Sequence, residues 1–144
     1  ASAQIQQKLQ SIGGDARVAV LKAIVSQASA AIPVVPLYAA LLFRVMKEQG
    51  SHEECIEHID RLFASQLQPE AEMRLDEAGR IRVDDLELAD RVQAEVKRRW
   101  PLVDTENLPE LGDLTGFRED FLKIFGFGID GVDYDADVDP QRIS

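Results

Sequence analysis

Two side chains in the first third of this chain have types and a spacing that could do chemistry. Tyr38 and Lys47 are separated by eight residues, and a Tyr/Lys pair can protonate a substrate while the Lys holds a cofactor ribose. The apolar spacing around them predicts one continuous helix over residues 37–49. At about 100° per residue, such a helix directs the two side chains to opposite faces. We therefore reject this pair as a catalytic dyad.

A second candidate is a group of metal-ligating side-chain types. His52, Cys55 and His58 follow one another at intervals of three residues on one predicted helix. At this spacing the outer two side chains are rotated by about 120° from a convergent position. Three ligands of a tetrahedral site cannot converge easily from such an arrangement. We predict no metal site here and interpret Cys55 as a small core side chain.

Two further motifs lie near the C-terminus. Gly126, Gly128 and Gly131 match the G-x-G-x-x-G pattern, but they follow a predicted helix and no βαβ unit follows them, so a glycine-rich turn is the better interpretation. Four alternating acidic residues resemble the start of a calcium loop, although the Gly and Glu that such a loop needs further on are missing. These four residues are Asp133, Asp135, Asp137 and Asp139.

The strongest site candidate lies within residues 17–47. Residues 18–25 form an apolar, β-branched run that predicts a strand buried on both faces, as in a parallel sheet covered by helices. Ligands of open α/β sheets bind beyond the carboxyl ends of the strands, so we predict a cofactor site whose backbone amides and Ser26 hydroxyl meet a nicotinamide carboxamide or ribose. An ordinary strand-to-helix turn remains the alternative. The predicted cofactor residues are Ala23, Ile24, Val25 and Ser26.

The remaining elements predict one mostly helical unit without a second comparable strand. A parallel strand needs neighbours, so we expect the partner strands outside this chain. The first predicted element is a helix over 5–12, which Gly13 and Gly14 end, and a second helix begins at Ser51 with Glu54 in a capping box. The apolar stripe of this second helix consists of Ile56, Ile59, Leu62 and Phe63. We further predict a short edge strand or loop over 80–83, a helix from Asp84 or Asp85 to Trp100, a helix over 114–124 with Phe117, Phe121 and Leu122 inward, and an extended tail.

The net charge and the cysteine content exclude some classes of partner and of cellular location for this protein. The net charge is −10, and residues 51–144 carry most of the acidic side chains, which argues against a nucleic-acid partner. The single cysteine excludes an intrachain disulfide and favours a reducing, cytoplasmic location. No segment reaches the roughly 18 uninterrupted apolar residues of a membrane span. A stand-alone acidic helical module that binds a basic partner therefore remains an alternative to an enzyme.

Several long segments resemble one known family, and together they cover nearly the whole chain. They are KAIVSQASAAIPVVPLYAALLFRVMKEQGSHEECIEHIDRLF, DEAGRIRVDDLELADRVQAEV, WPLVDTENLPEL and FREDFLKIFGFGIDGVDYDADVDP. These segments resemble the trans-2-enoyl-CoA reductases, which are the V-type enoyl-ACP reductase family. They correspond to about the C-terminal third of the chains of that family. The resemblance implies an α/β fold, the C-terminal part of a Rossmann-like domain related to the short-chain dehydrogenases, mostly helical here with one buried parallel strand.

The resemblance also implies a function. Members of the family reduce the trans-2 double bond of enoyl-CoA or enoyl-ACP thioesters in fatty acid synthesis, usually with NADH. Their Tyr-x8-Lys motif and glycine-rich cofactor loop are expected upstream of Ala1, so we expect no catalytic residue in residues 1–144 and no activity from this chain alone. The chain would then partner the remaining N-terminal part of the same enzyme. The resemblance implies that Phe43 and Phe117 line the acyl pocket, with Phe117 where relatives often have Tyr, and core packing of the two rings remains the alternative.

Overall fold

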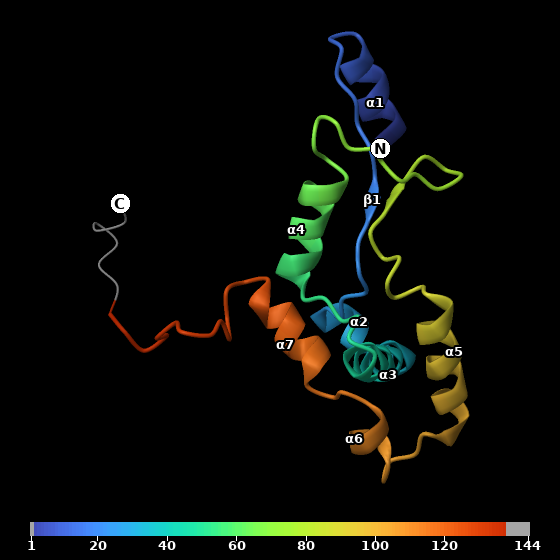
Figure 1. Ribbon diagram of the computed structural model, residues 1–144. Coiled ribbons are helices and arrows are strands. Elements are labelled where there is room, and N and C mark those ends of the chain that lie inside the picture. Colours follow the sequence, from blue (N-terminus) through green and yellow to red (C-terminus); the bar gives the residue numbers. More distant parts are fainter. Residues whose placement is uncertain (1, 138–144) are drawn as a thin grey trace.

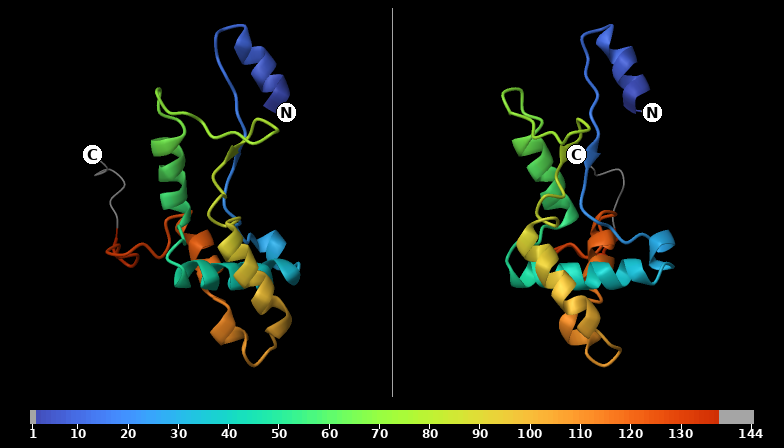
Figure 2. Two further views of the ribbon diagram at one scale, coloured as in Figure 1. Left: turned by 45° about the vertical axis from the view of Figure 1, so that its right-hand side comes forward. Right: turned by 90° about the vertical axis from the view of Figure 1, so that its right-hand side faces the viewer.

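The structure, a computed structural model, describes residues 2–137 and is built around one long central helix, α3 (Figure 1). Several other helices pack against α3, whereas the N-terminal helix lies far from it, with the small parallel sheet between the two, as the rotated views of Figure 2 show. The elements are α1 (Ser2–Gln10), β1 (Ala19–Val20), α2 (Gln27–Ala30), α3 (Val34–Glu48), α4 (Cys55–Ser65), β2 (Ile81–Arg82), α5 (Asp90–Arg99), a 3-10 turn (Trp100–Leu102), α6 (Leu108–Leu111) and α7 (Gly116–Lys123). The architecture is thus α/β and mostly helical.

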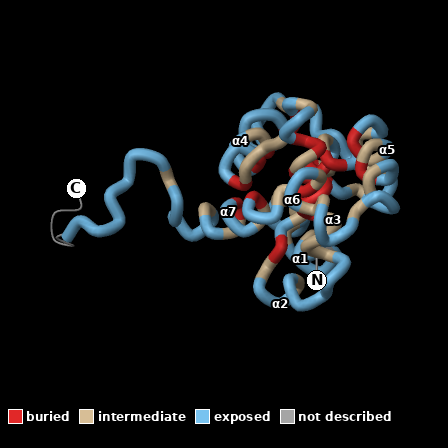
Figure 3. Tube along the Cα trace, turned by 90° about the horizontal axis from the view of Figure 1, so that it is seen from below, coloured by how far each residue is buried: buried red, intermediate tan, exposed pale blue. Residues whose placement is uncertain are grey.

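Helix α3 forms the centre of the main hydrophobic core. Its sequence is apolar on nearly every face, which is typical of a helix that neighbours cover on all sides. Pro36 lies in its first turn, where the missing N–H costs no hydrogen bond. The core combines residues of α3 and α5, and Figure 3 shows buried segments where the helices meet. The core residues are Leu41, Leu42, Phe43, Val45, Met46, Val92 and Val96.

The predicted strand over 18–25 is much shorter than expected and is not buried on both faces. Only Ala19–Val20 form a regular strand, and Val18 and Leu21 remain 39% and 38% exposed. A partner strand is present within the chain, because β1 pairs in parallel with β2, Ala19 opposite Ile81. The prediction of a parallel strand is confirmed, but the prediction that all of its partners lie outside the chain is wrong.

The strand ends early because side chains, not another strand, bind its next backbone amides. The N–H of Lys22 donates to Nε2 of His58 at 3.1 Å. The N–H of Ala23 donates to both carboxylate oxygens of Glu87, at 3.0 and 2.9 Å. The two backbone amides that follow the ladder are therefore paired with side chains and not with a neighbouring strand.

The boundary between α3 and α4 differs from the prediction of a Ser51 cap. Gly50 has a φ of +64°, and the N–H of Ser51 donates to the carbonyl of Met46 at 2.9 Å. This arrangement is a helix C-terminus of the Schellman type, so Ser51 belongs to the end of α3. Glu54 instead forms the capping box of α4, with Glu57 as its reciprocal partner.

The apolar stripe predicted for α4 is also wrong in part. Leu62 is buried as expected, together with Cys55 and His58. Ile56 and Phe63 are 59% and 57% exposed, however. The described chain therefore covers α4 on its Cys55 side and leaves an apolar strip open on another side.

The later helices form where the sequence predicts them, with shifted starts. Helix α5 begins at Asp90, not at Asp84 or Asp85, because residues 85–88 form turns, from which the Glu87 side chain binds the N–H of Ala23. Helix α7 begins at Gly116, with Phe117 packed against the core, while Leu122 is 37% exposed. The predicted helix before Gly13 is confirmed as α1.

The described tail, residues 125–137, runs away from the helices (Figure 1). Its glycines Gly126, Gly128 and Gly131 all have φ near +75°, which suits a series of turns and confirms the glycine-rich turn. Asp139 lies outside the described residues. Within residues 2–137, no helix combines the length and apolar character needed to cross a membrane.

Candidate functional site

A pocket lies between the segment that follows β1 and helix α7. It has a volume of about 340 Å³ and brings together three of the predicted site residues, Val25, Ser26 and Phe117. Most of its wall is apolar, and its polar groups come from Ser26, Gln27 and Arg118. The remaining lining residues are Ala30, Phe121 and Leu122. The segment that follows β1, together with α2, forms one wall of the cavity, and one face of α7 forms the other.

The other predicted site residues do not line this pocket. Phe43 is 1% exposed and packs in the core around α3. Ala23 has its N–H bound by Glu87, and Ile24 is 38% exposed beside the pocket wall. The structure therefore separates Phe43 and Ala23 from the cavity that Val25 and Phe117 share.

The backbone near the pocket has groups that remain available to a ligand. Ser26 caps α2, since its Oγ accepts from the N–H of Ser29 at 3.3 Å, and Ser29 returns the interaction. Within residues 2–137, the N–H and C=O groups of Ile24 and Val25 form no hydrogen bond. Backbone polar groups that are not paired within the protein normally find a partner in water or a ligand, so this segment suits a ligand with polar edges.

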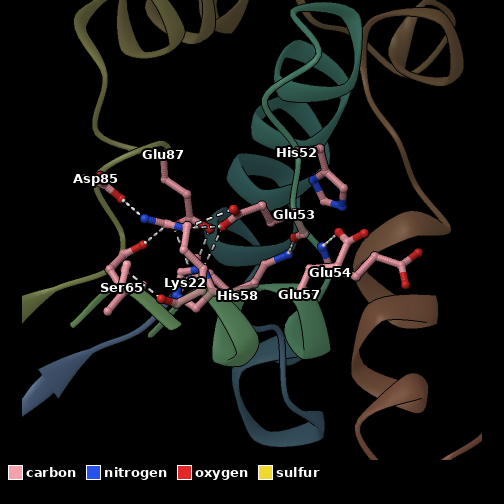
Figure 4. A network of polar contacts seen from close by, with 12 residues as sticks. Lys22, His52, Glu53, Glu54, Glu57, His58, Ser65, Asp85 and Glu87 are labelled. Carbon is pink, nitrogen blue, oxygen red and sulfur yellow. Dashed lines mark hydrogen bonds and ion pairs between the residues drawn. The ribbon is translucent and has the colours of Figure 1, made fainter. Parts of the chain in front are cut away.

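A buried charged side chain ties the strand end to α7. The Nζ of Lys22 lies 2.5 Å from Oδ2 of Asp120 in α7, and the two side chains are only 4% and 8% exposed. The same Nζ donates to the carbonyl of Glu53 and lies 4.6 Å from the ring centroid of Phe43. Figure 4 shows Lys22 among the polar groups that converge here.

Two further side chains hold the backbone of the same segment. Since Nε2 of His58 accepts from Lys22, its Nδ1 carries the proton and faces Oε2 of Glu53 at 3.3 Å. Burial lowers the pKa of His58 and outweighs the nearby carboxylate of Glu53. Burial raises the pKa of Glu87, although the N–H of Ala23 opposes the shift.

Asp120 lies between two basic side chains. Nε2 of His52 is 3.6 Å from Oδ2 of Asp120, beyond hydrogen-bond distance, and neither ring nitrogen of His52 has a hydrogen-bond partner among the described residues. Burial raises the pKa of Asp120, but His52 and Lys22 lower it more, so that the pKa lies below its usual value. Asp120 is therefore a buried carboxylate, paired with Lys22.

Comparisons with known proteins place the chain in a family. The family model described as "Trans-2-enoyl-CoA reductase catalytic region" matches residues 1–68, and the model described as "Enoyl reductase FAD binding domain" matches residues 75–138. The chain belongs to the trans-2-enoyl-CoA reductase family.

Relatives of this reductase family are similar over nearly the whole chain. An enoyl-[acyl-carrier-protein] reductase [NADH] of Opitutus terrae is 55% identical over 133 residues, which are 92% of this chain and 34% of that protein. The corresponding reductase of Variovorax paradoxus is 58% identical over 90% of this chain and 32% of its own length. The chain thus spans about a third of the length of the curated relatives it matches.

Solved trans-2-enoyl-CoA reductases share the fold of this chain. The enzyme of Clostridium acetobutulicum in complex with NAD superposes with a TM-score of 0.81 at 46% identity, over 96% of this chain and 36% of that chain. The enzyme of Treponema denticola in complex with NAD gives a TM-score of 0.77 at 45% identity, over 94% of this chain and 35% of its own.

The side chains that we rejected as a catalytic dyad and as a metal site make structural contacts in this chain. Tyr38 accepts a hydrogen bond from Gln93 at 3.0 Å, while Lys47 pairs with Asp113 at 2.6 Å. The side chains of Tyr38 and Lys47 therefore contact different residues and do not meet each other. Cys55 is buried, as expected for a core side chain, and burial raises the pKa of its thiol. Within the described part of the chain, no three His, Cys, Asp or Glu side chains are arranged to hold a metal ion.

The sequence analysis missed the charged residues around the pocket. Lys22 interrupts the apolar run over 18–25, and a charged residue within a predicted buried strand was the signal that a buried partner was needed. Asp120 lies between Phe117 and Phe121 on the predicted inner face of its helix, which carried the same signal. Glu87 had no such signal, because it lies in a segment rich in polar residues, and His58 was considered only as a metal ligand.

Proposed function

We propose that this chain is the C-terminal portion of an NADH-dependent reductase that reduces the trans-2 double bond of enoyl-CoA or enoyl-ACP thioesters in fatty acid synthesis. The observation that carries the proposal is the pocket that joins Val25 and Ser26 with Phe117, in a chain of the trans-2-enoyl-CoA reductase family. It lies beyond the carboxyl end of a parallel strand, where open α/β sheets bind their ligands. Residues 23–26 form the cofactor side, and α7 forms the substrate side.

NADH is the proposed cofactor, and it supplies the hydride when it is bound. Relatives are named for NADH, and related structures contain NAD or NADH, although one matching family model names FAD. The unpaired backbone groups of Ile24 and Val25 fit the polar edge of a nicotinamide carboxamide or ribose. Ala23 would act only by positioning the residues that follow it, because Glu87 binds its N–H and its side chain does not line the pocket.

The proposed roles of the two phenylalanines differ. Phe117 lines the pocket and would contact the acyl chain directly. Phe43 is buried beside Lys22, so it would support the substrate side from the core. Without a phenolic oxygen, Phe117 offers the thioester apolar contact and no hydrogen bond.

The rest of the enzyme completes the proposed fold. We propose a Rossmann-like sheet, related to that of the short-chain dehydrogenases, in which β1 gains a further parallel neighbour from an N-terminal part that carries the catalytic Tyr-x8-Lys motif. Within residues 2–137, β1 pairs with β2 alone, and the apolar side chains of Val18 and Leu21 stay largely exposed. The single, buried thiol of Cys55 supports a reducing, cytoplasmic location.

The test is a turnover assay with two forms of the protein. The full-length polypeptide that carries this chain should oxidise NADH when crotonyl-CoA is added, and residues 1–144 alone should not. Activity of residues 1–144 alone would contradict the proposal that the catalytic residues lie in an N-terminal part of the enzyme outside this chain. No crotonyl-CoA-dependent oxidation by the full-length polypeptide would contradict the proposed reaction itself.

A further inference from the structure

The two walls of the pocket are joined by a buried ion pair that does not itself line the pocket. Lys22 precedes Val25 by three residues on the strand side, and Asp120 follows Phe117 by three residues on α7. Residues three apart on a helix lie on neighbouring parts of its surface. The Lys22–Asp120 contact at 2.5 Å therefore connects the two segments that carry the walls of the cavity.

The pair is more isolated from water than the other ion pairs of the described chain. Lys22 and Asp120 are 4% and 8% exposed, whereas Lys123 and Glu54, which join α7 to the start of α4, are 26% and 40% exposed. A buried pair costs several kcal/mol of desolvation per ion, and well-packed apolar residues often match its stability. Stability alone is thus a weak reason for placing two charges here.

The surroundings of Lys22 fix its position tightly. Its Nζ donates to Asp120 and to the carbonyl of Glu53, its ammonium faces the Phe43 ring, and its own N–H is bound by His58. Glu87 fixes the next amide. The strand end is thereby held at both backbone and side chain, while Ile24 and Val25, which follow it, have unpaired backbone groups.

We propose that Lys22 and Asp120 are positioning residues that set the distance between the cofactor side and the substrate side of the pocket. This inference rests on the proposed function. The ion pair aligns α7 with the strand end, so that Phe117 faces Val25 and Ser26 across a cavity of fixed width. Neither residue touches the substrate, and each acts through the wall on which it lies.

The experiment replaces the pair by apolar side chains in the full-length polypeptide. Lys22→Met and Asp120→Val alone each leave one buried charge without a partner and should lower the thermal midpoint strongly. The double variant should regain most of that midpoint. If the pair positions the pocket, the double variant should still show a KM for crotonyl-CoA raised about 10-fold with kcat changed much less.

Hydrogen exchange provides a readout that needs no turnover. Peptides that cover residues 22–30 and α7 should exchange faster in the refolded double variant than in the unsubstituted protein, because the strand end has lost its tie to α7. Lys123→Gln, which removes an exposed pair of the same helix, should leave both KM and exchange unchanged. Should the double variant not fold, Asp120→Asn keeps the shape of the side chain and should give the same changes to a smaller extent.

Wild-type KM and wild-type exchange in a stable double variant would overturn the inference and leave the pair a structural contact only. Equal effects of Lys123→Gln would overturn it as well. Absence of turnover in the unsubstituted polypeptide would instead contradict the proposed function, while the exchange comparison would still decide whether the pair ties the two walls together.

Discussion

The two halves of this molecule are stabilised in different ways. Around α3, buried apolar side chains from α3 and α5 form a closed core, with Leu41, Val45 and Val92 all fully buried. Around β1 and α4, only a small apolar cluster centred on Ile81 is buried. Polar contacts hold the strand end there, and apolar side chains such as Phe63 remain exposed.

The difference fits the proposal that a further part of the enzyme packs against one half of this chain. The core around α3 buries its apolar side chains with the described residues alone. The half around β1 and α4 exposes apolar side chains on the strand and on the helix, as expected where a further part of the enzyme packs. The pocket lies at the boundary, with one wall from the strand end and one from α7.

The largest effect is expected from the closed core. Phe43→Ala removes a ring that is 1% exposed and should lower the free energy of unfolding by about 3–5 kcal/mol, since the surrounding helices cannot collapse onto the cavity. Urea denaturation measures this change. A loss below about 1 kcal/mol would show that the core around α3 is loosely packed.

The polar half should respond to pH through His58. Burial lowers the pKa of His58 below its ordinary 6.5, so the folded chain holds the ring neutral while the unfolded chain binds a proton first as the pH falls. The stability that neutral His58 contributes is therefore complete above pH 6.5 and is lost as the pH falls from 6.5 towards the lowered pKa.

The variant His58→Gln isolates this contribution, because Glu87 and Asp120 titrate in both proteins. Thermal melts at several pH values should show the variant less stable than the unsubstituted chain above pH 6.5. The difference should shrink below it. A difference that stays constant from neutral pH to pH 5 would contradict the effect of burial on His58.

The smallest effect is expected from the open strip on α4. Phe63→Ser in residues 1–144 should change the free energy of unfolding by no more than about 0.5 kcal/mol, since the ring is 57% exposed. In the full-length polypeptide the same substitution should cost clearly more, if a further part packs on this strip. Equal small costs in both would show that the strip stays uncovered.

The sequence predicted the helices well because their signals are local. The apolar spacing of α3 and the two glycines that follow α1 each act within a few residues of the chain. The predicted strand failed for a reason that is not local. Its length depends on His58 and Glu87, which lie 36 and 64 residues from the amides that they bind.

The site could be predicted in outline only. The placement rule for parallel strands led to Val25 and Ser26, and the resemblance to a known family led to Phe117, which lines the same pocket. The Lys22–Asp120 pair joins residues 98 apart in the sequence, and no spacing pattern connects them. Each of the two residues stands out in the sequence as a charge within an apolar segment. That they contact each other could be seen only in the structure.

The most direct test of the account fills the pocket without disturbing the core. Ala30 and Ala28 lie on the same short helix, α2, and both are exposed, but only Ala30 lines the pocket. In the full-length polypeptide, Ala30→Trp should weaken the binding of NADH or crotonyl-CoA, seen as a KM raised about 10-fold or more, while Ala28→Trp should leave both KM values unchanged. Unchanged KM values in both variants would contradict the assignment of this pocket as the ligand site.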